Sequence, residues 1–114
     1  MNFDLEERTT RFAKNVIVLC RDLPRNPIND RLINQVVGSA GSIGANYREA
    51  NDSLGRKDFL QRIRIDRREA KETLHWLDLI QEANDFKSKD VLPLMGEATE
   101  LKKIFSAIIN KFTV

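Results

Sequence analysis

The sequence predicts an all-α protein, an antiparallel four-helix bundle in up-down-up-down order. Apolar residues recur at steps of three and four along four long segments, and turn-forming residues separate these segments. No stretch shows the sustained alternation of apolar and polar residues that a strand requires. Four amphipathic helices with short connections pack as antiparallel neighbours. Because 114 residues is the usual size of one domain, we expect a single domain over residues 1–114.

The first predicted helix runs from about Asp4 to Leu23. Its apolar residues follow helical spacing and share one face: Leu5, Phe12, Val16, Leu19 and Leu23. Asp4 is a candidate N-cap, because its side chain can accept a hydrogen bond from a free backbone N–H of the first turn. Pro24 and Pro27 end the helix, since proline cannot continue it.

The second predicted helix runs from about Asn29 to Ser53. Its inner face holds Ile33, Val36, Ala40, Ile43 and Tyr47. Gly38, Gly41 and Gly44 each cost about 0.8–1.0 kcal/mol relative to alanine inside a helix, so we expect a neighbouring helix to approach closely there. A phosphate-binding loop is the alternative, but the glycines lack the preceding strand and the Lys-Ser/Thr pair of that motif.

The third and fourth predicted helices run from about Arg56 to Asp85 and from about Lys89 to Phe112. The inner face of the third holds Phe59, Ile63, Ala70, Leu74, Leu77 and either Ile80 or Gln81. Asp66 or Arg67 interrupts this face where an apolar residue is due, which makes the middle of the helix unusual. The fourth has the most regular spacing: Val91, Leu94, Ala98, Leu101, Phe105, Ile108 and Phe112.

Several apolar residues lie off these inner faces. They are Ile17, Leu60, Ile65, Leu79, Leu92, Ile104 and Ile109. This is more apolar surface than one face needs, so we expect copies of the chain to associate. The alternative is that wide apolar faces serve a single core.

The composition favours a cytoplasmic protein that does not contact a membrane. No apolar run approaches the roughly 20 residues that a membrane span needs, and the start of the chain is acidic and polar, unlike a signal peptide. The single Cys20 cannot form an internal disulfide. It lies in an apolar stretch, which predicts a buried thiol in a reducing compartment.

Residues that could carry catalysis or bind a metal are sparse. His75 is the single histidine, has no ligand partner at zinc-site spacing, and is expected to be partly buried and hydrogen-bonded. Nothing near Cys20 would lower its thiol pKa. Asp66, Glu69 and Glu72 lie at steps of three but among basic residues, and the Glu-x-x-His motif of di-iron bundles is absent from the sequence. We therefore expect no enzymatic activity, no metal and no cofactor.

The third helix carries a local surplus of positive charge in a chain whose net charge is only +2. Lys57, Arg64, Arg68 and Lys71 recur at seven, four and three, and would line one edge of the helix over about 21 Å. Such a row can neutralise phosphates of RNA or DNA. The candidate nucleic-acid-binding residues, with Arg48 extending the row from the preceding helix, are Arg48, Arg56, Lys57, Arg64, Arg67, Arg68 and Lys71.

The alternative for this basic edge is a solvated helix face with intrahelical ion pairs. Asp58 with Arg62 and Arg68 with Glu72 have the i,i+4 spacing for such pairs. Association of several copies would favour the binding interpretation, because an oligomer multiplies the basic surface.

Short motifs along nearly the whole chain resemble a known family. They are Phe12-Ala13, Leu23-Pro24, Gln35, Ser39-Ala40-Gly41-Ser42-Ile43-Gly44-Ala45-Asn46, Lys57-Asp58-Phe59, Ala70-Lys71-Glu72-Thr73, Trp76-Leu77 and Glu100-Leu101. The chain thereby resembles the four-helix-bundle proteins encoded in intervening sequences of bacterial 23S rRNA genes, which include the accessory variability determinants of diversity-generating retroelements. It departs from them at Glu49-Ala50, where many relatives have an acidic residue followed by glycine, and at the highly charged Asp66-Arg67-Arg68.

The resemblance implies an antiparallel bundle that assembles as a ring-shaped homopentamer with a basic surface. Together with the charge surplus of the third helix, it predicts a non-enzymatic bundle that binds RNA or DNA electrostatically, without reading base sequence. The alternative is a protein-interaction module whose partner is a reverse transcriptase or another protein.

Overall fold

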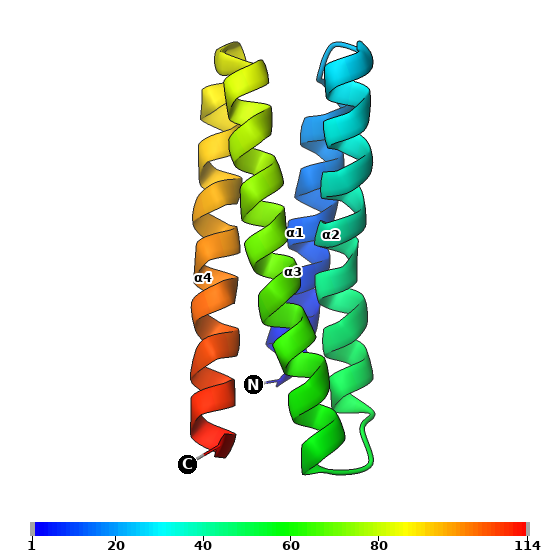
Figure 1. Cartoon of the computed structure of the whole chain (residues 1–114), viewed down its shortest axis with the longest axis vertical. Coiled ribbons are helices and arrows are strands. Elements are labelled where there is room, and N and C mark those ends of the chain that lie inside the picture. Colours follow the sequence, from blue (N-terminus) through cyan, green and yellow to red (C-terminus); the bar gives the residue numbers. More distant parts are fainter. Residues whose placement is uncertain (1, 114) are drawn as a thin grey trace.

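The computed structural model describes residues 2–113, and within this range it contains helices and turns but no strand. The elements are α1 (Asn2–Arg21), α2 (Pro27–Asn51), α3 (Arg56–Ala83), the short 3-10 helix η1 (Asp85–Lys87) and α4 (Ser88–Thr113). They form an elongated body with extents of 44 × 21 × 19 Å (Figure 1). The prediction of an all-α protein with four helices is confirmed.

The four long helices lie side by side along the long axis of the molecule (Figure 1). The connection between α1 and α2 lies at the same end as η1, whereas the connection between α2 and α3 lies at the opposite end, near both termini. Segments around residues 20–30 and 80–92 therefore meet at one end of the body. The middle of α3 lies far from either end.

The helix boundaries differ from the predicted ones by one to a few residues. α1 begins at Asn2, so Asp4 lies in its first turn, where its charge favours the helix dipole, and is not the N-cap. α2 begins at Pro27, because the side chain of Asn26 caps it by accepting a hydrogen bond from the Asn29 backbone N–H at 2.7 Å. Pro27 therefore begins α2 as well as preventing α1 from continuing.

The core consists of the predicted inner faces of all four helices, except that Phe112, predicted to lie on the inner face of the fourth helix, is exposed near the end of α4. Its largest fully buried apolar side chains are Phe12, Val16, Val36, Ile43, Tyr47, Ile63, Leu77, Ile80, Val91, Leu101 and Phe105. Of the apolar residues predicted to lie off these faces, Leu60 and Ile109 are buried, whereas Ile17, Leu79 and Leu92 are exposed. The wide-face interpretation is thus correct for two of these residues, and three remain on the surface.

The glycines of α2 do not all have the role that their spacing predicts. At Gly44, an added Cβ atom would lie 3.3 Å from Thr9 Oγ1 and 3.7 Å from the Thr10 backbone nitrogen, so α1 does approach closely at this position. At Gly38 and Gly41, a Cβ atom would have no neighbour within 4 Å, and both residues are exposed. The expected close approach is confirmed at Gly44 and is wrong at the other two, which face solvent.

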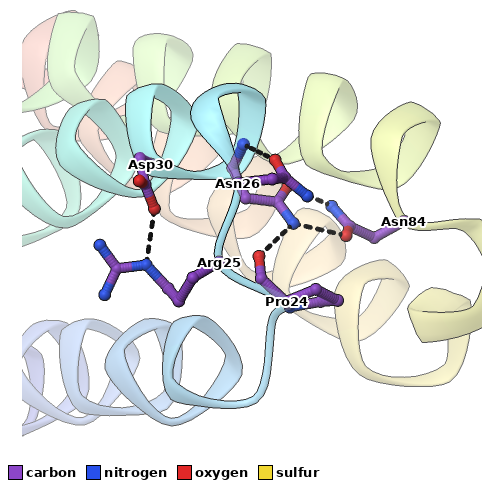
Figure 2. Close-up of polar contacts among 6 residues, drawn as sticks. Pro24, Arg25, Asn26, Asp30 and Asn84 are labelled. Atoms are coloured by element: carbon purple, nitrogen blue, oxygen red, sulfur yellow. Dashed lines mark hydrogen bonds and ion pairs between the residues drawn. The ribbon is translucent and has the colours of Figure 1, made fainter.

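A buried pair of amides joins the start of α2 to the end of α3 (Figure 2). Asn29 Nδ2 donates to Asn84 Oδ1 at 2.9 Å, and Asn84 Nδ2 donates back to Asn29 Oδ1 at 2.8 Å. Each amide also donates to a backbone carbonyl: Asn29 to that of Pro24 and Asn84 to that of Ile80. Every hydrogen-bonding atom of the two side chains is therefore used, and the pair fixes the α1–α2 connection against α3.

Asp66 is the residue that interrupts the inner face of α3, and its carboxyl group points into the core. The residue is completely buried, and among residues 2–113 neither carboxyl oxygen has a hydrogen-bond partner. Burial raises the pKa of Asp66 from its ordinary value of 3.8 to about 8, with a smaller contribution from the charge of Glu69. Arg67, the other residue that could have faced inward, is half-buried at the edge of the helix.

Candidate nucleic-acid interface

The outer face of α3 carries the basic row that the sequence predicts. Lys57, Arg64, Arg68 and Lys71 are all exposed, and they lie on the face opposite the buried Ile63 and its inner-face neighbours. This arrangement follows from their spacing, because residues three, four and seven apart share one side of an α-helix. The structure thus places these four side chains in solvent along a single helix.

A surface hollow of about 460 Å³ lies along the second half of this row. Its lining residues are Arg64, Arg67, Arg68, Lys71, Glu72, His75 and Trp76. Four cations and one carboxylate therefore surround the same space, and the cation surplus is three. Lys57 lies two turns before Arg64 and does not line the hollow.

The cations of the hollow have no ion-pair partners within residues 2–113. Among the described residues, no carboxylate lies within 4.0 Å of the charged nitrogens of Arg64, Arg67, Arg68 or Lys71. The predicted pair between Arg68 and Glu72 is not formed. Unpaired surface cations are available to an incoming anion without the cost of breaking an existing contact.

The predicted pair between Asp58 and Arg62 is not formed either. Arg62 lies between α3 and α2, where its Nη1 donates to Asn46 Oδ1 at 3.2 Å. This contact explains why Arg62 is half-buried and does not join the outer row. The interpretation of the basic edge as a face of intrahelical ion pairs therefore fails at both pairs that were expected.

Besides Lys57, two further candidate residues are placed away from the hollow. Arg48 lies against α1, where it forms an ion pair with Glu6 at 3.0 Å and donates to Thr10 Oγ1 at 3.0 Å. The guanidinium of Arg56 lies 5.8 Å from the centre of the Phe112 ring, near the end of α4. The structure therefore brings together Arg64, Arg67, Arg68 and Lys71 of the predicted set, and does not bring Arg48 or Arg56 to them.

His75 and Trp76 complete the hollow, although neither was among the site residues predicted from the sequence. Their ring centres are 5.0 Å apart, and the ring planes meet at 63°, an edge-to-face arrangement. The expectation that His75 is partly buried and hydrogen-bonded is wrong: it is exposed, and its ring has no hydrogen bond among residues 2–113. Its position four residues after Lys71 and seven after Arg68 was the available signal that it shares their face.

The environment of Cys20 does not suit a nucleophile. The thiol is buried, and burial raises its pKa to about 11, which is the opposite of what an activated cysteine requires. Within residues 2–113, no group of three or more His, Cys, Asp or Glu side chains is placed to hold a metal ion. Over the same part of the chain, no helix is both long and apolar enough to cross a bilayer.

Comparisons with known proteins identify the family of the chain. No curated protein matches it. Among solved structures, it is similar to the crystal structure of a protein of unknown function from the S23 ribosomal protein family of Bacteroides thetaiotaomicron. The two are 29% identical with a TM-score of 0.79, and the match covers 91% of this chain and 96% of that chain. The model of the 23S rRNA-intervening sequence protein family matches residues 1–107. The chain therefore belongs to the 23S rRNA-intervening sequence protein family.

Proposed function

We propose that this protein is a non-enzymatic helical bundle that binds RNA or DNA through the hollow on α3. The observation that carries the proposal is a group of four cations around one space, none of which has an ion-pair partner in the part of the chain that the structure describes: Arg64, Arg67, Arg68 and Lys71. Guanidinium and ammonium groups bind phosphate oxygens and release condensed counterions, which makes such binding favourable and sensitive to salt. The contacts are to the backbone, so base sequence is not read.

The test is the affinity for labelled RNA and DNA of the wild type and of the double variant Arg64→Glu/Arg68→Glu. The variant is expected to bind about tenfold more weakly at low salt, and its log-log salt slope falls by about 0.7–0.9 for each phosphate that the protein no longer neutralises. The matched control is Arg11→Glu/Lys14→Glu, which reverses two exposed charges on α1 and changes the net charge equally. Equal weakening by both variants, or no binding by the wild type, would contradict the proposal.

We also propose that neighbouring helices of the bundle run antiparallel. Connections at alternate ends of the body support it (Figure 1). In this order the outer face of α3 stays free, because α3 contacts α2 on one side and α4 on the other.

We also propose that copies of the chain associate, and the family resemblance implies a ring of five. Support comes from exposed apolar side chains in the segments of the chain that lie toward the end of the body with η1 (Figure 1): Ile17, Val18, Ile28, Leu79, Phe86 and Leu92. Exposed apolar groups in this number favour a protein–protein contact. Sedimentation of a single subunit at high concentration would contradict the proposal.

A second candidate function is a protein-interaction module, for which the same apolar end offers a surface. Its partner would be a reverse transcriptase or another protein. Co-purification from the native host tests it: a partner retained by the wild type and absent with Phe86→Ser/Leu92→Ser would support this function. Unchanged retention by that variant, whose substitutions are both at exposed positions, would count against it.

A further inference from the structure

The hollow on α3 combines two kinds of side chain that recognise different parts of a nucleotide. The cations from Arg64 to Lys71 extend over about 10 Å of helix, and the aromatic pair follows within the next turn. Trp76 is half-buried and packs against the core, so its ring is held in place by apolar contacts. His75 is exposed and lies edge-to-face against it. The aromatic end of the hollow is therefore a fixed surface next to a row of positive charge.

Cations bind the phosphates that every form of nucleic acid carries, and they do not read whether the bases are paired. Aromatic rings distinguish single strands from duplexes. In a duplex the base faces are stacked on one another and are not accessible, whereas an unpaired base can place its face on an aromatic side chain. A site with both groups favours the form whose bases are free.

We propose that the hollow selects single-stranded nucleic acid, with the backbone along Arg64, Arg68 and Lys71 and a base stacked at the His75–Trp76 pair. This inference rests on the proposed function, and it adds the class of nucleic acid and two residues that determine the preference. Single-stranded DNA and single-stranded RNA can make the same contacts, because the proposed contacts are to phosphates and base faces and not to the 2′-hydroxyl.

The chain contains a single tryptophan, so its intrinsic tryptophan fluorescence reports on Trp76 alone. A short single-stranded oligonucleotide, and the duplex formed with its complement, are each titrated into the protein. The single strand is expected to quench the fluorescence and to bind about tenfold more tightly than the duplex. The duplex is expected to bind through phosphate contacts and to leave the fluorescence unchanged.

Variants at His75 test the aromatic contribution without disturbing the core, because this side chain is exposed. His75→Ala is expected to weaken single-strand binding about fivefold and to reduce the ratio of single-strand to duplex affinity, whereas His75→Phe keeps the preference. The control is Asp78→Ala, an exposed position one turn further along α3 that does not line this hollow.

The outcomes separate this inference from the proposed function. Equal affinity for single strand and duplex, or a preference that survives His75→Ala without quenching, overturns the inference. The proposed function still holds in that case if Arg64→Glu/Arg68→Glu weakens binding of both forms. Absence of binding to either form at low salt overturns both.

Discussion

Two polar sites are buried to the same degree in this bundle, but they differ in their hydrogen bonding. Asn29 and Asn84 are 1% and 2% exposed, and Asp66 is fully buried. The two amides satisfy each other and two backbone carbonyls. The carboxyl of Asp66 has no partner among the described residues.

The difference follows from where the two sites lie along the helices. At a helix end, the last carbonyls and the turn carbonyls have no partner within the helix, so they are free to accept from a side chain. The carbonyl of Pro24 is in a connection, and that of Ile80 is in the last turn of α3. In the middle of α3, each backbone N–H is already used by the helix, so a carboxyl oxygen that must accept finds no free backbone donor, whereas the buried hydroxyl of Thr73 donates to the Glu69 carbonyl. A buried side chain that needs a donor therefore finds few partners there.

The largest expected effect is a dependence of stability on pH that comes from Asp66. In the unfolded chain its carboxyl has the ordinary pKa of 3.8, whereas in the bundle burial raises the pKa to about 8. Between these values the folded state holds a proton that the unfolded state has released, so rising pH favours unfolding. The free energy of unfolding should fall by about 1.4 kcal/mol per pH unit over this window and level off above pH 8.

The variant Asp66→Asn tests this comparison, because an amide of the same shape cannot ionise. Urea unfolding from acidic to mildly alkaline pH should give a much flatter profile for the variant, and above the raised pKa of about 8 the variant should be the more stable protein. Asp58→Asn, at an exposed carboxyl on the same helix, is the control and should keep the wild-type slope. An unchanged slope in Asp66→Asn would mean that other groups carry the pH dependence.

The next effect is the removal of one amide of the Asn pair. Asn84→Leu leaves Asn29 Oδ1 buried without a donor, and the free energy of unfolding should fall by about 1–3 kcal/mol. Chemical denaturation at constant pH measures it. The control Asn51→Leu removes an amide near the other end of α2 that bonds a more accessible partner, Glu6, and should cost less. A smaller decrease in Asn84→Leu than in Asn51→Leu would show that the buried pair adds little stability.

The smallest effect is expected in the coupling between the two amides, which is measured by removing both together. In Asn29→Leu/Asn84→Leu no donor or acceptor of the pair remains unpaired, so the decrease in stability should be clearly smaller than the sum of the two single decreases. A double-mutant cycle from the four unfolding curves gives this coupling. Additive decreases would mean that the two side chains act independently, and the contrast with Asp66 would then rest on charge alone.

Most of the fold and about half of the candidate site could be predicted from the sequence. The steps of three and four located all four helices to within a few residues, because burial of one helix face requires that spacing. The same spacing predicted the outer row of Lys57, Arg64, Arg68 and Lys71. It did not show that Arg48 turns toward Glu6 or that Arg62 turns toward Asn46, since these contacts join residues on different helices.

The glycines of α2 illustrate the same limit. Their three-residue spacing suggested one shared role, but each step of three rotates the position by about 60° around the helix, so Gly38 and Gly41 face solvent while Gly44 faces α1. The spacing of residues along one helix does not show which other helix packs against each of its faces.

The sequence by itself determined the helices, their inner faces and the concentration of positive charge on one of them, because these depend on neighbours within three or four residues. Only the tertiary structure decided that Asp66 is buried with no hydrogen-bond partner among residues 2–113, that Asn29 and Asn84 meet, and that His75 and Trp76 border the basic hollow. The physical reason is that hydrogen bonding and ion pairing depend on which groups from distant parts of the chain come within about 3–4 Å, and packing sets those distances.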